Sequence, residues 1–381
     1  INVRCDLAIM GNGTVTRTDT VNTYSMFWMG SNDFDEIYIY GGTWKNESSN
    51  AILDANKAKV ANIYGGSFTT EKASFFAISG VEGFTLNLFG GTITGGSEPA
   101  INLSAKAGTV NIYGGTINAG KRTGDGGAIR MSTDGTINMT GGTINGNEVT
   151  GVGGSVYMQS GTFNMDGGTI QQGEAKGDCG GNIALYLTAV FNMTGGTISG
   201  GTAVRGGNVA VYGGTFDMSG GTLTDGSSSM FGGNVYLRNV TFAMSGNAEI
   251  KDGKGAGTGD NVFVELWNAS GNLTMTDNAK IYGGETDNVY LKASTMEMSG
   301  NATVIADAGE EGNAIYVSRN YDYHPTTNAP TGTSSSLTLS GNASVVAENG
   351  VNENAILVYG YTGDNAKDSL HIAAGWNGTA Y

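Results

Sequence analysis

Four aromatic residues recur at equivalent positions of a repeated segment, where they could contact sugar rings or another protein. They lie in stretches such as NVYL and NVFV, with Val, Ile or Leu on both sides, and they are Tyr236, Phe263, Tyr290 and Tyr316. Neighbouring side chains of a strand point to opposite faces, so we expect the aliphatic residues to face a core and the aromatic ones to face away. Such a column could be stabilised by ring stacking alone, or it could form a platform for a ligand or partner. Both interpretations remain open at this point.

A second set of candidate residues lies in an insertion that interrupts the repeat. The stretch RNYDYHPTTNAP, at 319–330, carries Tyr321, Tyr323 and His324 close to Tyr316. Long loops on a rigid scaffold often carry binding residues, although this loop could equally fold back over the aromatic column. The predicted binding surface therefore comprises Tyr236, Phe263, Tyr290, Tyr316, Tyr321, Tyr323 and His324.

The charged residues form no catalytic or metal-binding motif. Acidic side chains such as Asp33, Asp252 and Glu310 are scattered, and few recur at matching positions of adjacent repeats. The two histidines, His324 and His371, have no evident partner in the sequence. We predict no catalytic residues and no cofactor, and the net charge of −15 leaves Ca²⁺ binding open without a motif that indicates it.

The acidic composition also excludes two classes of partner. With 34 Asp and Glu against 19 Lys and Arg, the chain lacks the positive charge that nucleic acids and anionic membrane surfaces attract. No apolar run approaches the roughly 20 residues of a membrane-spanning helix. We therefore expect neither nucleic-acid binding nor membrane insertion.

A repeated segment, written TINMTGGTI at 136–144, must position all of these side chains. Its Gly-Gly pair recurs every 24 to 28 residues between Gly90 and Gly220. Apolar and polar residues alternate before each pair, which indicates a short strand with one inward face, and the glycines permit a sharp corner. A second aromatic column directly precedes the pair in the first half of the chain: Tyr40, Tyr64, Phe89 and Tyr113.

Two or three short strands per period of about 25 residues, without helical periodicity, predict an all-β solenoid of about 13 coils. Equivalent residues should then stack about 4.8 Å apart. The pattern predicts an inward Met column and structural columns of Asn and Thr. Cys5 and Cys179 lie six or seven coils apart, about 30 Å at that spacing, which is too far for a disulfide.

The corner series, for example VNIYGGTI at 110–117 and FNMTGGTI at 191–198, resembles the right-handed parallel β-helix of the pectin-lyase-like superfold. More narrowly, together with the GGNV strands, it resembles the Gly-Gly-Thr-Ile repeat regions of large bacterial cell-surface proteins of the kind common in gut Firmicutes. The resemblance covers about residues 5–375. It implies a single-stranded right-handed parallel β-helix, an adhesive or stalk role, and a location at the bacterial surface or in the secreted fraction.

We therefore expect one domain over residues 1–381, a fragment of a longer protein, with loop insertions near 17–34 and 319–335. The leading hypothesis is a non-enzymatic surface module, adhesin-like or a stalk, that binds a carbohydrate or a host surface protein. The alternative is a polysaccharide lyase or glycoside hydrolase of the same superfold, although the NTD, DD, GHG and RIK signatures of the pectinolytic hydrolases are absent. The sequence shows no caps at its ends, which makes end-to-end or side-by-side self-association a further expectation.

Overall fold

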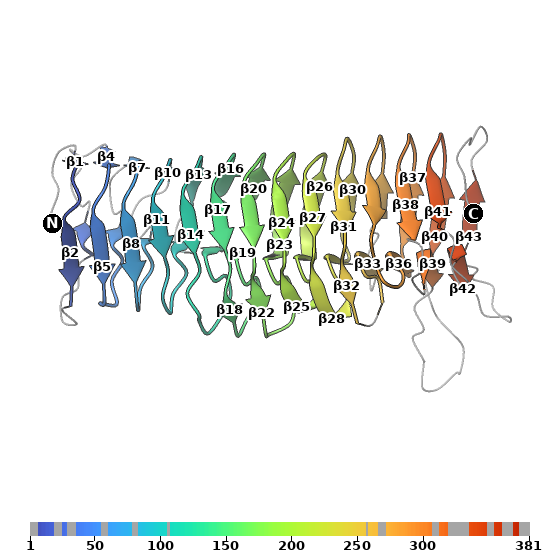
Figure 1. The fold of residues 1–381 in the computed structure, drawn as a ribbon, viewed down its shortest axis with the longest axis horizontal. Helices are drawn as coiled ribbons and strands as arrows, with labels where there is room; N and C mark the ends of the chain where they lie inside the picture. Colours follow the sequence, from blue (N-terminus) through green and yellow to red (C-terminus); the bar gives the residue numbers. More distant parts are fainter. Residues whose placement is uncertain are drawn as a thin grey trace.

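The computed structural model is a rod of stacked coils built from parallel strands (Figure 1). It describes residues 7–18, 25–28, 36–54, 60–77, 83–104, 107–256, 258–265, 272–306, 312–318, 335–348, 354–359 and 369–372. Every regular element in these ranges is a β-strand, which confirms the all-β parallel solenoid. None of the elements described is a helix long and apolar enough to cross a membrane.

Three sheets run along the rod. The 13-stranded sheet takes one strand from each coil, from β2 (Thr14–Arg17) to β41 (Ser344–Ala347). The 25-stranded sheet consists of two rows, which join where β23 (Ile183–Met193) and β26 (Val209–Met218) run from one row into the other. We call the row that leads into the glycine corners the corner row. Its strands include β4 (Glu36–Ile39), β7 (Val60–Ile63), β10 (Phe84–Leu88), β13 (Gly108–Ile112), β16 (Thr136–Met139) and β20 (Thr162–Met165).

We call the other row of this sheet the loop row, because variable loops precede its strands. It includes β15 (Ile129–Met131), β19 (Val156–Met158), β29 (Val235–Arg238), β33 (Val262–Glu265), β36 (Val289–Lys292) and β39 (Asn313–Ser318). In the middle of the rod, the loops add a third, five-stranded sheet, which lies along one edge in Figure 1. Its strands are β18 (Glu148–Val149), β22 (Glu174–Ala175), β25 (Thr202–Arg205), β28 (Ser227–Phe231) and β32 (Lys254–Gly255).

The core follows the strand alternation. On β20, Phe163 and Met165 point inward and are at most 1% exposed, whereas Thr162 and Asn164 point outward. Inward phenylalanines stack from coil to coil, with the Phe216 and Phe242 ring centroids 4.4 Å apart. The predicted methionine column is confirmed as core, and its members are Met139, Met165, Met193, Met218, Met244, Met275 and Met298.

The two corner glycines have different roles. A Cβ atom on Gly195 would lie 2.4 Å from the carbonyl oxygen of Asp166 in the coil below, so the first position has no room for a side chain. Gly196 has φ +86°, a backbone conformation that is energetically less favourable for residues with a Cβ atom than for glycine. The following threonines are in register from Thr116 through Thr143, Thr169 and Thr197, which confirms the predicted Thr column.

A buried ladder of asparagines ties the coils together. Asn182, Asn208, Asn234, Asn261 and Asn288 are 0% exposed, and each of the first four donates from its amide nitrogen to the amide oxygen of the next Asn along the rod. Each side chain also bonds the backbone of its neighbourhood: Asn234 accepts from Gly226 N at 3.1 Å and donates to Lys251 O at 2.8 Å. Because buried polar groups must be paired, this column has the structural role predicted for it.

The two predicted insertions fall mostly outside the described residues, which omit 19–24, 29–35 and 319–334. Cys5 also lies outside them. Cys179 is buried and is not part of a disulfide, in agreement with the predicted free thiol.

Candidate functional site

The aromatic column of the loop row is stacked as expected, but part of it is covered. The ring centroids lie 5.8 Å apart for Tyr236 and Phe263, 5.1 Å for Phe263 and Tyr290, and 4.7 Å for Tyr290 and Tyr316. The two planes of each pair are nearly parallel. Tyr236 and Phe263 are each 1% exposed, whereas Tyr290 and Tyr316 are partly buried. Of the four rings named as part of the candidate binding surface, Tyr236 and Phe263 are therefore covered.

The cover comes from the third sheet. Tyr236 and Phe263 form a cluster with Cys179 that is separate from the main core, so their predicted direction, away from that core, is correct. Phe231, at the end of β28, stacks on Phe263 with centroids 4.6 Å apart. The Tyr236 hydroxyl donates to Glu265 Oε2 at 2.7 Å, and Lys292 pairs with Glu265 Oε1 at 2.6 Å. The covered part of the column, at Tyr236 and Phe263, is a poor ligand platform.

Tyr321, Tyr323 and His324, the other predicted site residues, lie outside the described residues. Their proposed contact with a ligand therefore stays a prediction. So does their proximity to Tyr316.

The buried thiol of Cys179 belongs to the same covered cluster. Its Sγ lies 3.1 Å from the Tyr186 hydroxyl. Burial raises the pKa of Cys179 to about 12, because the thiolate would be poorly solvated there. Burial likewise raises the pKa values of Tyr186 and Tyr212. A thiol that stays protonated is unreactive, so the structure supports the predicted packing role over a chemical one.

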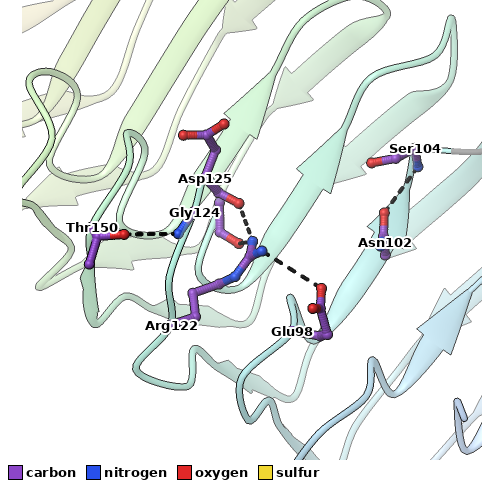
Figure 2. A network of polar contacts seen from close by, with 8 residues as sticks. Glu98, Asn102, Ser104, Arg122, Gly124, Asp125 and Thr150 are labelled. Atoms are coloured by element: carbon purple, nitrogen blue, oxygen red, sulfur yellow. Dashed lines mark hydrogen bonds and ion pairs between the residues drawn. The ribbon is translucent and has the colours of Figure 1, made fainter. Parts of the chain in front are cut away.

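The charged side chains around Arg122 form hydrogen bonds that hold a loop in place (Figure 2). Arg122 donates through Nη1 to the carbonyl oxygens of Asp125 and Gly126, and its Nη2 lies 3.7 Å from Glu98 Oε2. The Asp125 carboxylate instead accepts a bond from Val152 N at 3.1 Å. Catalysis would require charged groups to converge on an open point, whereas this guanidinium is directed at backbone.

No group of three or more His, Cys, Asp or Glu side chains suited to a metal ion occurs within the described ranges. The Ca²⁺ binding that the net charge left open stays a prediction.

Among the residues that the structure describes, the most open aromatic side chains are those of the second column. Tyr40, Tyr64, Phe89 and Tyr113 are 46, 42, 41 and 48% exposed. Their centroids are 4.9, 4.8 and 4.8 Å apart and successive planes differ by 6, 6 and 11°. We call these four residues the corner stripe, because each follows a corner-row strand and precedes a Gly-Gly pair. Met10, 74% exposed, holds the same position in the coil before Tyr40.

A second outward column lies two residues before the stripe. Successive asparagines donate Nδ2 to the preceding Oδ1 at 2.8–2.9 Å, and they are Asn62, Asn87, Asn111, Asn138, Asn164 and Asn192. We call this column the outer amide ladder. Each amide has two N–H donors and two acceptor lone pairs. From Asn87 to Asn164 the ladder uses one of each along the rod, which leaves the others for water or a ligand. Asn62 differs, because it is 7% exposed and donates to Glu36 Oε2 at 3.3 Å.

The face that carries these two columns is nearly uncharged. On β7, β10, β13 and β16, the outward side chains and the residue after each strand are Val, Thr, Asn, Tyr or Phe. Glu36 on β4 and Asp166 after β20 are the charged residues at its two limits. Over four successive coils this face therefore carries no charged residue, in a chain of which 14% of the residues are charged.

Comparisons with known proteins do not assign a role to this face. No protein-family model matches the chain, and no curated protein or solved structure does either. What the face can do must therefore be argued from the stripe, the ladder and their surroundings.

Proposed function

We propose that this chain is a non-enzymatic, adhesin-like β-solenoid module that binds an extracellular ligand through the corner stripe and the outer amide ladder. The support is one feature of the stripe: its aromatic residues are not required by the fold. Later coils carry Thr140, Asp166 and Thr194 at the same position before the same Gly-Gly corner. Aromatic rings in four adjacent coils are thus an addition to a scaffold that forms without them.

The exposure of the stripe supports a contact surface. Four rings left 41–48% exposed present a contiguous apolar patch of the order of a few hundred Å². Patches of that size on soluble proteins often serve binding. A partner that covered the rings would remove this area from water at a gain of roughly 25 cal/mol per Å².

The resemblance to repeat regions of bacterial surface proteins is consistent with this role and with an extracellular location. A polysaccharide lyase or hydrolase has less support, because the charged clusters among the described residues are used in loops and buried pairs. In a ligand-free stalk the stripe would serve ring stacking alone, whereas Thr140 and Thr194 stand before the same corner without it.

The test is a binding screen with a paired variant. Purified protein and the Tyr64→Thr/Phe89→Thr double variant are applied to a glycan array and to a panel of host extracellular proteins. Threonine is the residue that the same column carries at 140 and 194, so the fold accommodates it. Thr194→Ala is the control outside the stripe. Binding that the double variant loses and the control keeps would support the proposal. Binding unchanged in the double variant, or no binding at all, would contradict it.

A further inference from the structure

We propose that the ligand of this face is a neutral, extended polysaccharide chain that lies along the rod axis, with successive sugars in register with successive coils. This inference rests on the proposed function, because the same stripe and ladder make the contact. It goes further in naming the chemistry, direction and length of the ligand.

Charge selects a neutral ligand. The outward positions of β7, β10, β13 and β16 include no Lys or Arg to pair with a uronate, sulfate or phosphate group. The whole chain carries a net charge of −15, and the acidic residues Glu36 and Asp166 lie at the two ends of the face. An anionic polymer would approach against this field and find no cation to compensate its desolvation.

The spacing of the contacts selects a linear repeating polymer. Stripe rings recur at 4.8–4.9 Å, and the outer amides recur once per coil with bonds of 2.8–2.9 Å between them. An extended glycan with equatorial linkages advances per sugar by a distance similar to the inter-strand spacing of about 4.8 Å. Over the few coils of the stripe, each sugar can thus lie near one ring and one amide, with neighbouring sugars presenting alternate edges.

The outer amide ladder matches the hydroxyl groups of such a chain. Asn87 donates to Asn62 at 2.9 Å and accepts from Asn111 at 2.8 Å, which orients its amide plane along the rod. Its second N–H and second oxygen lone pair remain for an external donor and acceptor. A hydroxyl is both donor and acceptor, so a sugar can use the two together.

The stripe matches the apolar flank of the same chain. Carbon atoms in contact lie about 3.5–4.0 Å apart, so parallel rings with centroids 4.8 Å apart must be offset from one another. Offset rings keep part of each face open, in agreement with their exposure of 41–48%. The C–H groups of a sugar can pack there while its hydroxyls reach the amides two residues away.

Two other occupants fit less well. A peptide strand adds to a sheet through an open edge, whereas β10 and β13 are paired with strands on both sides. A second copy of the chain would bring equal negative charge, and the stripe exposes less than the roughly 800 Å² per partner of a stable complex.

The first test uses oligosaccharides of increasing length. Titration calorimetry with neutral β-linked oligomers of two to eight sugars should show affinity rising with each unit and reaching a plateau at about four to six, the number of coils that the stripe and its borders span. Polygalacturonate and hyaluronate serve as charged comparisons and should bind more weakly. Equal affinity for a dimer and a hexamer, or tighter binding of the charged polymers, would overturn the inference.

The second test compares two matched amide variants. Asn87 and Asn164 both bond two ladder neighbours, but only Asn87 lies beside the stripe. Asn87→Val should lower affinity for the longest oligomer by about tenfold, the effect of losing one or two net hydrogen bonds, whereas Asn164→Val should change it by less than about twofold. Equal effects of both variants on affinity, with equal effects on stability, would contradict the inference.

The two proposals fail in different ways. A protein or charged glycan that binds in a Tyr64-dependent manner, with no neutral glycan binding, would overturn the polysaccharide inference and leave the binding role of the stripe standing. If no ligand of any class responds to Tyr64→Thr, both proposals fail.

Discussion

The Phe89 and Tyr113 rings stack with centroids 4.8 Å apart and planes 11° apart, yet each is more than 40% exposed. Stacking of this kind is usual inside the rod, where Phe191 and Phe216 do the same at 0% exposure. The interior stack is held by the core around it. The exterior stack has only its own neighbours and the strand register, so its contribution to stability can be measured separately.

Tyr64→Thr should lower the free energy of unfolding by about 1–3 kcal/mol, because Tyr64 stacks on both Tyr40 and Phe89 and each aromatic pair contributes about 0.5–1.5 kcal/mol. Tyr40→Thr should cost about half as much, since Tyr40 stacks on one aromatic ring of the stripe. Urea unfolding of the two variants tests this. Equal losses, or no loss, would show that the rings do not stabilise one another.

Asn234→Leu should destabilise the middle of the rod by at least about 3 kcal/mol. The substitution leaves Gly226 N, Lys251 O and the amides of Asn208 and Asn261 without their partner, and each unsatisfied buried group costs about 1–3 kcal/mol. Solenoids can unfold in parts, so amide hydrogen exchange in residues 226–261 is the appropriate measurement.

Asn247→Leu is the matched control for the buried ladder. Asn247 accepts a bond from Asn278 at 3.2 Å in an exposed ladder, where water can replace the lost partner. We expect a change within about 0.5 kcal/mol. An effect as large as that of Asn234→Leu would mean that burial does not govern the cost.

The coil was predictable from sequence because local features specify it. The alternation around Phe163 and Met165 defines an inward face, and the Gly195–Gly196 pair permits a corner that other residues would block. These signals recur at a nearly constant spacing, so the same local structure is predicted for each coil. The stacked register of the threonines then follows from the parallel pairing.

The openness of the aromatic columns was not predictable in the same way. Tyr236 and Tyr64 both alternate with core residues, and the sequence treats them alike. Arg205 of β25 lies over the Tyr236 ring and Phe231 of β28 stacks on Phe263, and both strands belong to a loop-borne sheet that, among the described residues, does not extend beside the corner stripe. Loop residues follow no repeat, so the cover over Tyr236 and Phe263 depends on tertiary packing that the period does not encode.

Leu187→Asn should stabilise the protein by about 1 kcal/mol. Leu187 has φ +50° and is 61% exposed, and the left-handed region costs a branched side chain roughly 1–2 kcal/mol. The next coils place Gly213 and Asn239 at this position, with φ +128° and +57°. Thermal unfolding measures the gain. Leu187→Ala lacks the side-chain amide that favours the left-handed region and should gain less, so an equal gain from both variants would point to the exposed apolar surface instead of the backbone.

The buried thiol and tyrosines predict that stability falls at alkaline pH. Burial raises the pKa of Cys179 from its ordinary 9.0 to about 12 and also raises the pKa values of Tyr186, Tyr212 and Tyr236. Below about pH 9 both folded and unfolded chains keep these protons. Above it the unfolded chain releases them while the folded one retains them, so unfolding becomes more favourable as pH rises toward 12.

A series of thermal unfolding measurements from pH 8 to pH 11 should therefore show a midpoint that falls with pH, and Tyr186→Phe should make the fall shallower because it removes one of the retained protons. Thr188→Val, which removes an exposed hydroxyl that does not titrate, is the control and should keep the original slope. A midpoint that rises with pH, or identical slopes in protein and Tyr186→Phe variant, would show that the cluster around Cys179 is open to water.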